Sequence, residues 1–564
     1  MIRPTDFLPT TLAEARAKGW DELDVILITA DDYVDHPSFG MAIVGRYLES
    51  LGLRVGIIPR PIVDNNDDFT VLGIPKMFFG VTAGNLDSMV SKYTAARKIR
   101  SDDPYAAGGL AQGRPYLPSI VYTNKIKSLF KNVPVVLGGI EASLRRTAHY
   151  DHYHGRVRPS VLLAAKADML VYGNGEAPLK DLVGRLRDGT PFDAIHDIRG
   201  TAIPVNAGKR ELIADARILP SYEVVSDNAD AFNDMTRIIM EELNPHNAKP
   251  LAQDTAGRAV RINPPAFALS TVELDAAFDL PYTRKAHPRY TKTIPALAVI
   301  ENSIISHRGC YGGCSFCALA LHQGKTIQSR SKVSVEREIK TISAQTGKPV
   351  VITDVGGPTA NMYGTCCTSS EANKVCKRPS CLFPEICKHL DTSHANYRAL
   401  LNELRNMPEA KRVYINSGIR YDLALRDEAF IAELAEHHTQ GRLSTAPEHV
   451  DAGVLRIARK PSFAVYEKFA RVFDGVSKRA GLKQYLVPYL IAGLPGETQQ
   501  AAESLIRETR KPHMRSVQVQ EFYPTPMTIA AAMYYTGKDP FTGEKVHIEK
   551  SERVKRMRKR RIVR

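Results

Sequence analysis

The sequence predicts an α/β fold, with an N-terminal doubly wound parallel sheet followed by a full or partial (β/α) barrel. Three observations support this prediction. Short apolar runs alternate with helical patterns in both halves of the chain, and several runs end in glycines that lead into helices. The chain also has 564 residues, which is too long for one ordinary domain.

The N-terminal third alternates in this way from its start. Residues 24–29 and 53–58 are apolar runs typical of buried strands, and residues 40–51 between them have apolar side chains at helical spacing. Three further apolar runs follow, at residues 77–80, 134–137 and 168–172. Ligands of doubly wound sheets bind where the strands end, so we expect any ligand of this domain beside the glycines there.

A second alternating set begins near residue 291. Predicted strands lie at residues 297–300, 350–354, 412–415 and 484–491. Predicted helices lie at residues 333–344, 397–406, 429–436 and 498–510. Repeated strand–helix units of this kind predict a full or partial parallel barrel.

These patterns give the domain boundaries. We assign residues 1–204 to the first α/β domain, 205–290 to a connecting segment, 291–548 to the barrel with a Cys-rich insertion at 359–395, and 549–564 to a basic tail. Residues 205–290 are treated as a connection because their periodicity is weak and Asn, Asp and Pro are frequent. We expect only some helix there, around residues 230–243.

Charge and hydropathy limit the class of protein. The net charge is +15, and the residues from Glu549 to the end include nine basic and two acidic side chains. A basic tail can attract phosphate backbones, although we expect a disordered, solvated tail. The sequence contains neither a membrane-length apolar run nor a secretory signal pattern. We therefore expect a cytoplasmic protein with no membrane association.

All eight cysteines lie between Cys310 and Cys387. A secreted disulfide protein would distribute its cysteines through the fold, so this grouping favours metal binding. Cys310, Cys314 and Cys317 have the spacing CxxxCxxC in a glycine-rich loop. Three thiolates around a 4Fe–4S cluster leave one iron open for another ligand. A zinc site completed by His307 or His322 is the alternative.

A second group of cysteines follows in the insertion. Four thiolates, those of Cys367, Cys376, Cys381 and Cys387, form a candidate site for zinc or a second Fe–S cluster, and Cys366 adjoins them. The insertion is long and has few hydrophobic residues, so it needs something to organise it. Free thiols, redox-active or not, are the alternative.

The triplet, with Phe316 before its third cysteine, resembles the cluster-binding loop of the radical S-adenosylmethionine (SAM) superfamily. Further segments resemble the YgiQ-type family of radical SAM proteins over roughly residues 5 to 550; these are residues 35–40, 138–145, 356–362 and 523–526. The resemblance implies that SAM binds the open iron and is cleaved to a 5′-deoxyadenosyl radical. It also implies an electron donor such as flavodoxin or ferredoxin. Members of the family usually continue further, so we expect a truncated or altered C-terminus.

The resemblance also implies contacts with SAM. Gly356 and Gly357, at a predicted strand end, correspond to backbone that meets the SAM amino group, although Pro358 follows where Glu is more usual. Ser417 and Arg420 follow the next strand and are expected at the ribose or carboxylate. His449 lies in a further turn that faces SAM or substrate in such barrels. Ordinary loops at strand ends are the alternative for each.

The first domain resembles the cobalamin-binding domain that precedes many radical SAM barrels. The D-x-H-x-x-G loop that supplies a cobalt ligand is absent, and Asp35-His36 has the wrong spacing. We therefore do not expect cobalamin. The residues His149, His152 and His154 are expected to form a polar surface turn rather than a metal or phosphate site.

The sequence thus predicts a radical SAM enzyme whose substrate it does not identify. The alternative is a non-catalytic, metal-stabilised nucleic-acid-binding protein. Only the basic charge favours RNA as a partner.

Overall fold

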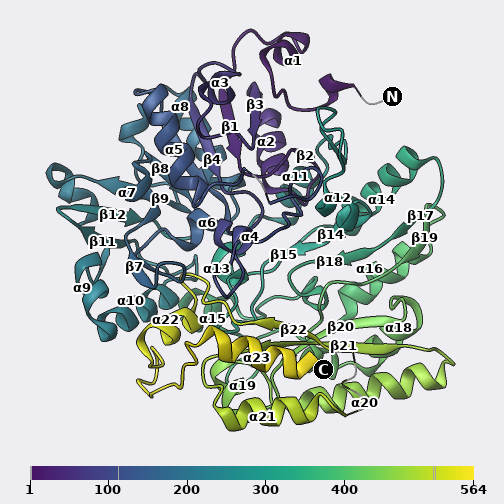
Figure 1. Ribbon diagram of the computed structural model, residues 1–564. Coiled ribbons are helices and arrows are strands. Elements are labelled where there is room, and N and C mark those ends of the chain that lie inside the picture. Colours follow the sequence, from purple (N-terminus) through teal and green to yellow (C-terminus); the bar gives the residue numbers. More distant parts are fainter. Residues whose placement is uncertain (1–2, 112, 512–513, 515, 564) are drawn as a thin grey trace. The chain divides into compact units, whose positions relative to one another are not determined.

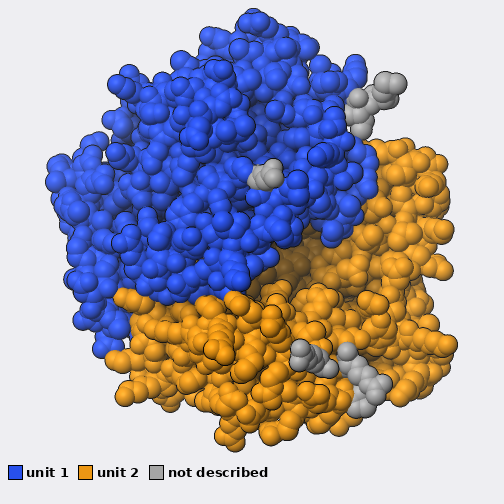
Figure 2. Space-filling model, viewed as in Figure 1, with its two compact units in different colours: residues 1–267, 276–301 blue, residues 268–275, 302–564 orange. Residues whose placement is uncertain are grey.

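The computed structural model describes residues 3–111, 113–511, 514 and 516–563. They form two compact units, drawn in blue and orange in Figure 2. Unit 1 comprises residues 1–267 and 276–301, and unit 2 comprises residues 268–275 and 302–564. The predicted α/β class is confirmed in both. No helix in the described ranges is long and apolar enough to cross a membrane.

Unit 1 contains a nine-stranded sheet (Figure 1). Its parallel part is formed by β3 (Val55–Pro59), β1 (Val25–Thr29), β4 (Phe78–Thr82), β5 (Val135–Gly138) and β8 (Met169–Val171), in that spatial order. These strands are almost completely buried, which matches their continuous apolar runs. The chain moves from β1 to β3 on one side and then to β4 on the other. The order of the strands therefore reverses between β1 and β4, as in doubly wound folds.

The sheet continues into the segment that we expected to be a connection. Its outer part is formed by β9 (Thr201–Val205), β12 (Arg258–Ile262), β11 (Leu251–Thr255) and β10 (Arg217–Leu219), and β9 runs antiparallel to β8. The strands are only three to five residues long, too short to give a clear periodic pattern between Asn- and Pro-rich turns. The expected helix is present as α10 (Ala229–Glu241).

Residues 297–300 form part of a helix, α12 (Pro295–Ile300), and not the predicted strand. Pro295 occupies the first turn, where its fixed φ and missing N–H favour a helix. No residue of α12 is buried, so this apolar run does not lie inside a sheet. The strand that precedes the cysteine triplet comes a few residues later, as β14 (Ser303–Ile305).

Unit 2 is a ladder of parallel strands with helices between them. The strands are β14, β18 (Asp354–Gly356), β17 (Val350–Ile352), β19 (Ala410–Val413), β20 (Arg442–Glu448), β21 (Tyr485–Ala492) and β22 (Gln518–Glu521). A parallel bridge between Ile419 and Thr445 links the segment after β19 to β20. Within the described part of the chain β14 does not pair with β22, so the barrel is partial.

Helices cover this ladder and enclose a single apolar core with its strands. They include α14 (Lys332–Thr346), α16 (Ala395–Arg405), α18 (Glu428–His437), α20 (Phe463–Arg479) and α21 (Gln499–Glu508). Each presents one apolar face to the strands, as the predicted helical spacing requires.

The basic C-terminal segment is folded, whereas we expected a disordered tail. It forms α23 (Glu552–Val563), which contacts β21, β22 and α21. Lys555, Arg558 and Ile562 are buried on one face of this helix. They are three and four residues apart, so the aliphatic stems of the two cations contribute to an apolar stripe despite their charge. Arg564 lies outside the described residues.

Candidate functional site

The cysteine triplet lies in a loop after the first strand of the partial barrel. β15 (His307–Arg308) pairs with β16 (Gln328–Ser329) and leads into the loop. Gly309 turns the chain with φ of 90°, and an added Cβ would stand 2.1 Å from the carbonyl oxygen of Thr326. Only glycine fits this turn.

The three thiols gather in the loop. A Cβ at Gly312 would lie 3.3 Å from the Sγ of Cys310 and 3.9 Å from that of Cys314. Burial raises the pKa of the Cys310 and Cys317 thiols, and the neighbouring Cys314 raises both further. A cationic centre would offset this effect and favour the thiolates of Cys310 and Cys317.

Arg420 supplies one positive charge at this place. Its Nη1 lies 3.7 Å from the Sγ of Cys314. Its Nε and Nη2 donate to the two carboxylate oxygens of Asp422 at 2.8 and 2.6 Å. Asn361 fixes the backbone, because its Oδ1 accepts from the N–H of Arg420 at 2.8 Å. Two of the guanidinium nitrogens therefore hold the carboxylate, and the third faces the cysteine loop.

The predicted Gly-Gly strand end lies beside Ser417. A Cβ at Gly356 would stand 2.4 Å from the Oγ of Ser417, and one at Gly357 would stand 2.6 Å from the carbonyl oxygen of His307. Asp354 holds the turn, because its Oδ1 accepts from the N–H of Ser417 at 2.9 Å and its Oδ2 accepts from the Ser417 hydroxyl. The structure thus brings Gly356, Gly357 and Ser417 together.

Glu448 is a buried charged residue that the sequence analysis did not select. It ends β20 with φ of 68°, which is unusual for a residue other than glycine. The Nζ of Lys460 lies 3.7 Å from its carboxylate. Burial raises the pKa of Glu448, and Lys460 opposes that effect. Glu448 also raises the pKa of Cys317, so its carboxylate lies near the triplet. Its position in a strand-end turn, next to the selected His449, could have identified Glu448 from the sequence.

His449 is held away from solvent. Its Nδ1 accepts from the N–H of Asp451 at 3.0 Å, and its Nε2 lies 3.5 Å from Glu497, in the turn after β21. Arg558 of α23 donates to the Oε1 of Glu497 at 2.9 Å. His449 therefore connects two strand ends to the C-terminal helix.

A cavity of about 450 Å³ opens beside these groups. The insertion forms one wall through Leu382 to Ile386, and Asp422 and Lys460 contribute to the other. The partners of Arg420 and Glu448 therefore also line a space that admits a small molecule.

Zinc receives no support from the geometry. In the described residues no three His, Cys, Asp or Glu side chains converge closely enough to hold one metal ion. This applies to the triplet as well. A cuboidal cluster is wider than one ion, because each thiolate binds a different iron atom. The three thiols are the donor type that such a cluster requires.

The histidines 149, 152 and 154 do not form one site. His149 and His152 are buried, contrary to the expected surface turn, and bond to the carbonyl oxygens of Thr147 and Ala95. The Nδ1 of His154 lies 2.8 Å from Asp151. Their separate partners stabilise local backbone.

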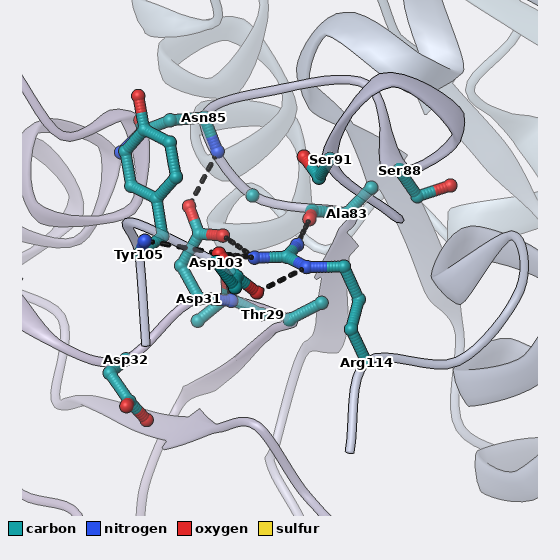
Figure 3. Close-up of polar contacts among 12 residues, drawn as sticks. Thr29, Asp31, Asp32, Ala83, Asn85, Ser88, Ser91, Asp103, Tyr105 and Arg114 are labelled. Carbon is teal, nitrogen blue, oxygen red and sulfur yellow. Dashed lines mark hydrogen bonds and ion pairs between the residues drawn. The ribbon is translucent and has the colours of Figure 1, made fainter. Parts of the chain in front are cut away.

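The carboxyl edge of the unit 1 sheet is filled by an ion-pair network (Figure 3). Between β1 and β4, Asp31 accepts from the Nη2 of Arg114 at 2.7 Å and from the N–H of Asn85 at 2.6 Å. The Nε of Arg114 donates to Asp103 at 2.9 Å. A Cβ at Gly84 would stand 2.2 Å from the Asp31 carboxylate.

A small cavity of about 10 Å³ lies at the switch point of the sheet, and the described residues Thr29, Asp31 and Gly84 are among those that line it. Asp35 is paired with Arg46 at 2.6 Å, and His36 is fully buried and accepts from the N–H of Ser38 at 3.0 Å.

Family comparisons cover almost the whole chain. A model described as Radical SAM N-terminal matches residues 7–303, the Radical SAM superfamily model matches residues 304–509, and a domain of unknown function, DUF3362, matches residues 517–564. A UPF0313 protein of Geobacter sulfurreducens is 46% identical over 98% of this chain and 91% of the relative. The UPF0313 protein YgiQ of Escherichia coli is 43% identical over 99% of this chain and 83% of the relative.

Among solved structures, the chain is similar to the radical SAM methyltransferase TsrM of Kitasatospora setae, solved with tryptophan and a SAM analogue. The TM-score is 0.52 at 16% identity, over 90% of this chain and 75% of that one. TsrM with cobalamin and a 4Fe–4S cluster gives a TM-score of 0.51. At such identity the similarity shows a shared fold alone.

Proposed function

Because the chain belongs to the UPF0313 family of radical SAM proteins, we propose that it is an enzyme that cleaves SAM reductively at a 4Fe–4S cluster held by Cys310, Cys314 and Cys317. The supporting observation is the gathering of three half-buried thiols in one loop, with the guanidinium of Arg420 3.7 Å from the Sγ of Cys314. When bound, such a cluster supplies the electron that converts SAM to methionine and a 5′-deoxyadenosyl radical, which acts on a substrate.

Arg420 places a positive charge against the cysteine loop in this proposal. Its guanidinium is buried and lies 3.7 Å from the Sγ of Cys314, where it would offset part of the negative charge of a bound cluster. Asp422 keeps the guanidinium in one orientation through two hydrogen bonds. Arg420 is therefore assigned to the cluster, and Asp422 is a residue that positions Arg420.

The turn at Gly356, Gly357 and Ser417 is assigned to SAM. Both glycines are needed for the close packing of this turn, because a Cβ at Gly356 would overlap Ser417 and one at Gly357 would overlap His307. Asp354 holds Ser417 through its backbone N–H and hydroxyl, which fixes the turn before a ligand binds. The cavity bounded by Asp422 and Lys460 is assigned to substrate or to part of SAM.

The reaction needs a one-electron donor, for which a flavodoxin or a ferredoxin has suitable chemistry. The nucleic-acid-binding alternative gains no support, because two of the tail's cations, Lys555 and Arg558, are buried inside unit 2. We therefore keep a single function.

The test is production of 5′-deoxyadenosine. The full chain is purified without oxygen, reconstituted with iron and sulfide, reduced with dithionite and incubated with SAM. We expect 5′-deoxyadenosine from the wild type and none from a Cys310→Ala/Cys314→Ala/Cys317→Ala variant. Iron bound by the wild type, with a Mössbauer spectrum that changes when SAM is added, would support an open iron in the absence of substrate. If the Mössbauer spectrum of the wild type does not change when SAM is added, the proposal is refuted.

A further inference from the structure

The Cys-rich insertion has almost no core of its own. From Cys366 to Ser393, only Ser380 and Leu382 are buried. After the short helix α15 (Ser370–Val375), no helix or strand is present among residues 376–394, all of which are described. An irregular segment of this length does not hold one conformation through apolar burial, so another interaction must organise it.

Three thiols of the insertion come together. The N–H of Cys387 donates to the carbonyl oxygen of Cys381 at 2.8 Å. Burial raises the pKa of the Cys381 thiol to about 11; Lys325 opposes this, and Cys376 and Cys387 add to it. The Nζ of Lys325 lies 3.6 Å from the Sγ of Cys376. Three sulfur atoms and one ammonium group therefore occupy the same neighbourhood.

Cys367 is linked to this group through the backbone. It forms an antiparallel bridge with Leu390, whose N–H donates to the carbonyl oxygen of Cys387 at 3.0 Å. Leu390 packs in the same apolar cluster as Cys381. The exposed thiol of Cys367 contacts the carbonyl oxygen of Ser369 at 3.4 Å, so it would have to turn toward the other three thiols to share a ligand with them.

The insertion is fastened to the loop of the first triplet. The N–H of Cys381 donates to the carbonyl oxygen of Tyr311 at 3.0 Å, and the Oγ of Ser380 donates to that of Gly312 at 2.7 Å. A Cβ at Gly313 would stand 2.5 Å from the Cβ of Ser380. The two cysteine groups are thus joined by direct contacts within unit 2.

We propose that Cys367, Cys376, Cys381 and Cys387 hold a second iron–sulfur cluster, closed by four thiolates, which organises the insertion beside the first cysteine loop. Four thiolates leave no iron open, in contrast to the triplet. Zinc is the other ion that four thiolates bind, so zinc content is measured beside iron in the test. Lys325 compensates part of the negative charge of the thiolates.

The test compares iron and acid-labile sulfide in reconstituted full-length variants, with zinc measured in parallel. A Cys310→Ala/Cys314→Ala/Cys317→Ala variant should keep iron and sulfide in about equal amounts. Its Mössbauer spectrum should not change when SAM is added. A Cys367→Ala/Cys376→Ala/Cys381→Ala/Cys387→Ala variant should keep only the SAM-responsive cluster. The wild type should bind more iron than either.

Cys366 and Cys367 provide a matched pair of controls. Cys366→Ala should keep the wild-type iron content. Cys367→Ala should lose iron, and the loss should fall on the part of the Mössbauer spectrum that SAM does not change. The proposal is overturned if the triple variant binds no iron, or binds zinc in its place, or if the wild type contains only one, SAM-responsive cluster. The iron, sulfide and zinc contents of the wild type and of the triple variant test the second cluster even if the quadruple variant does not fold.

The second site does not depend on SAM cleavage. If the triplet holds no cluster, the quadruple variant will contain no iron while the triple variant still does. Failure of the proposed function and failure of this inference therefore give different results.

Discussion

Arg420 and Cys314 are 106 residues apart in the chain, yet the guanidinium Nη1 lies 3.7 Å from the thiol sulfur. Arg420 is only 5% exposed. Its bidentate pair with Asp422 leaves one nitrogen for Cys314. Arg420 therefore connects the cysteine loop to the turn after β19.

Replacing Arg420 should damage both stability and the cluster. Arg420→Ala leaves the carboxylate of Asp422 buried without its partner, which costs about 3–5 kcal/mol of unfolding free energy. Arg420→Lys should recover only part of this, because one ammonium cannot make the bidentate pair. Denaturant unfolding and iron content measure the two effects. Arg412→Ala, at an exposed arginine of the same unit, is the control and should change neither.

Gly356 and Gly418 offer a matched pair at the predicted SAM turn. Gly356→Ala places a Cβ 2.4 Å from the Oγ of Ser417, and such crowding costs about 1–3 kcal/mol. We expect weaker SAM binding and slower 5′-deoxyadenosine formation, because Ser417 must leave Asp354. Gly418→Ala meets no atom within 4 Å and should behave as the wild type. Equal SAM affinity in the two variants would contradict the assignment of this turn.

Arg558 should be required for the stability of unit 2. Its guanidinium is buried and donates to Glu497 at 2.9 Å, so Arg558→Ala leaves that buried carboxylate without its arginine and costs about 3–5 kcal/mol. Arg560 lies on the exposed face of the same helix, and Arg560→Ala should change stability by less than about 0.5 kcal/mol. Thermal and denaturant unfolding distinguish them. Similar stability in both variants would mean that α23 does not dock as described.

His394 should make unit 2 acid-sensitive. Burial lowers its pKa from 6.5 to about 4, and its Nε2 lies 3.1 Å from the amide nitrogen of Asn361. The folded pKa is below the unfolded one, so unfolding takes up a proton, and stability is lost as the pH falls from 6.5 toward 4. The loss from this residue is about 3 kcal/mol.

The variant His394→Gln keeps an acceptor for Asn361 and removes the titration. Its unfolding free energy should therefore fall less than that of the wild type over the same pH range, measured by denaturant unfolding at each pH. Parallel pH profiles of the two proteins would show that other groups cause the acid sensitivity.

The local features of this protein could be predicted from its sequence. The CxxxCxxC spacing, the glycines around it and the continuous apolar runs of β1, β3 and β5 act over a few residues, so their patterns are readable without a structure. They predicted the α/β class and the gathering of Cys310, Cys314 and Cys317. The resemblance carried by the same segments predicted the family.

The contacts between residues far apart in the chain could not be predicted in this way. The contact of Arg420 with Cys314 and that of Arg558 with Glu497 depend on how strands and helices stack, and no local pattern encodes them. The same reason explains the differences from prediction. A run of arginines and lysines predicts a solvated tail, yet packing against β21, β22 and α21 stabilises α23 as a helix. Likewise, β9 to β12 are too short to predict alone and become strands because each completes the hydrogen bonds of its neighbour.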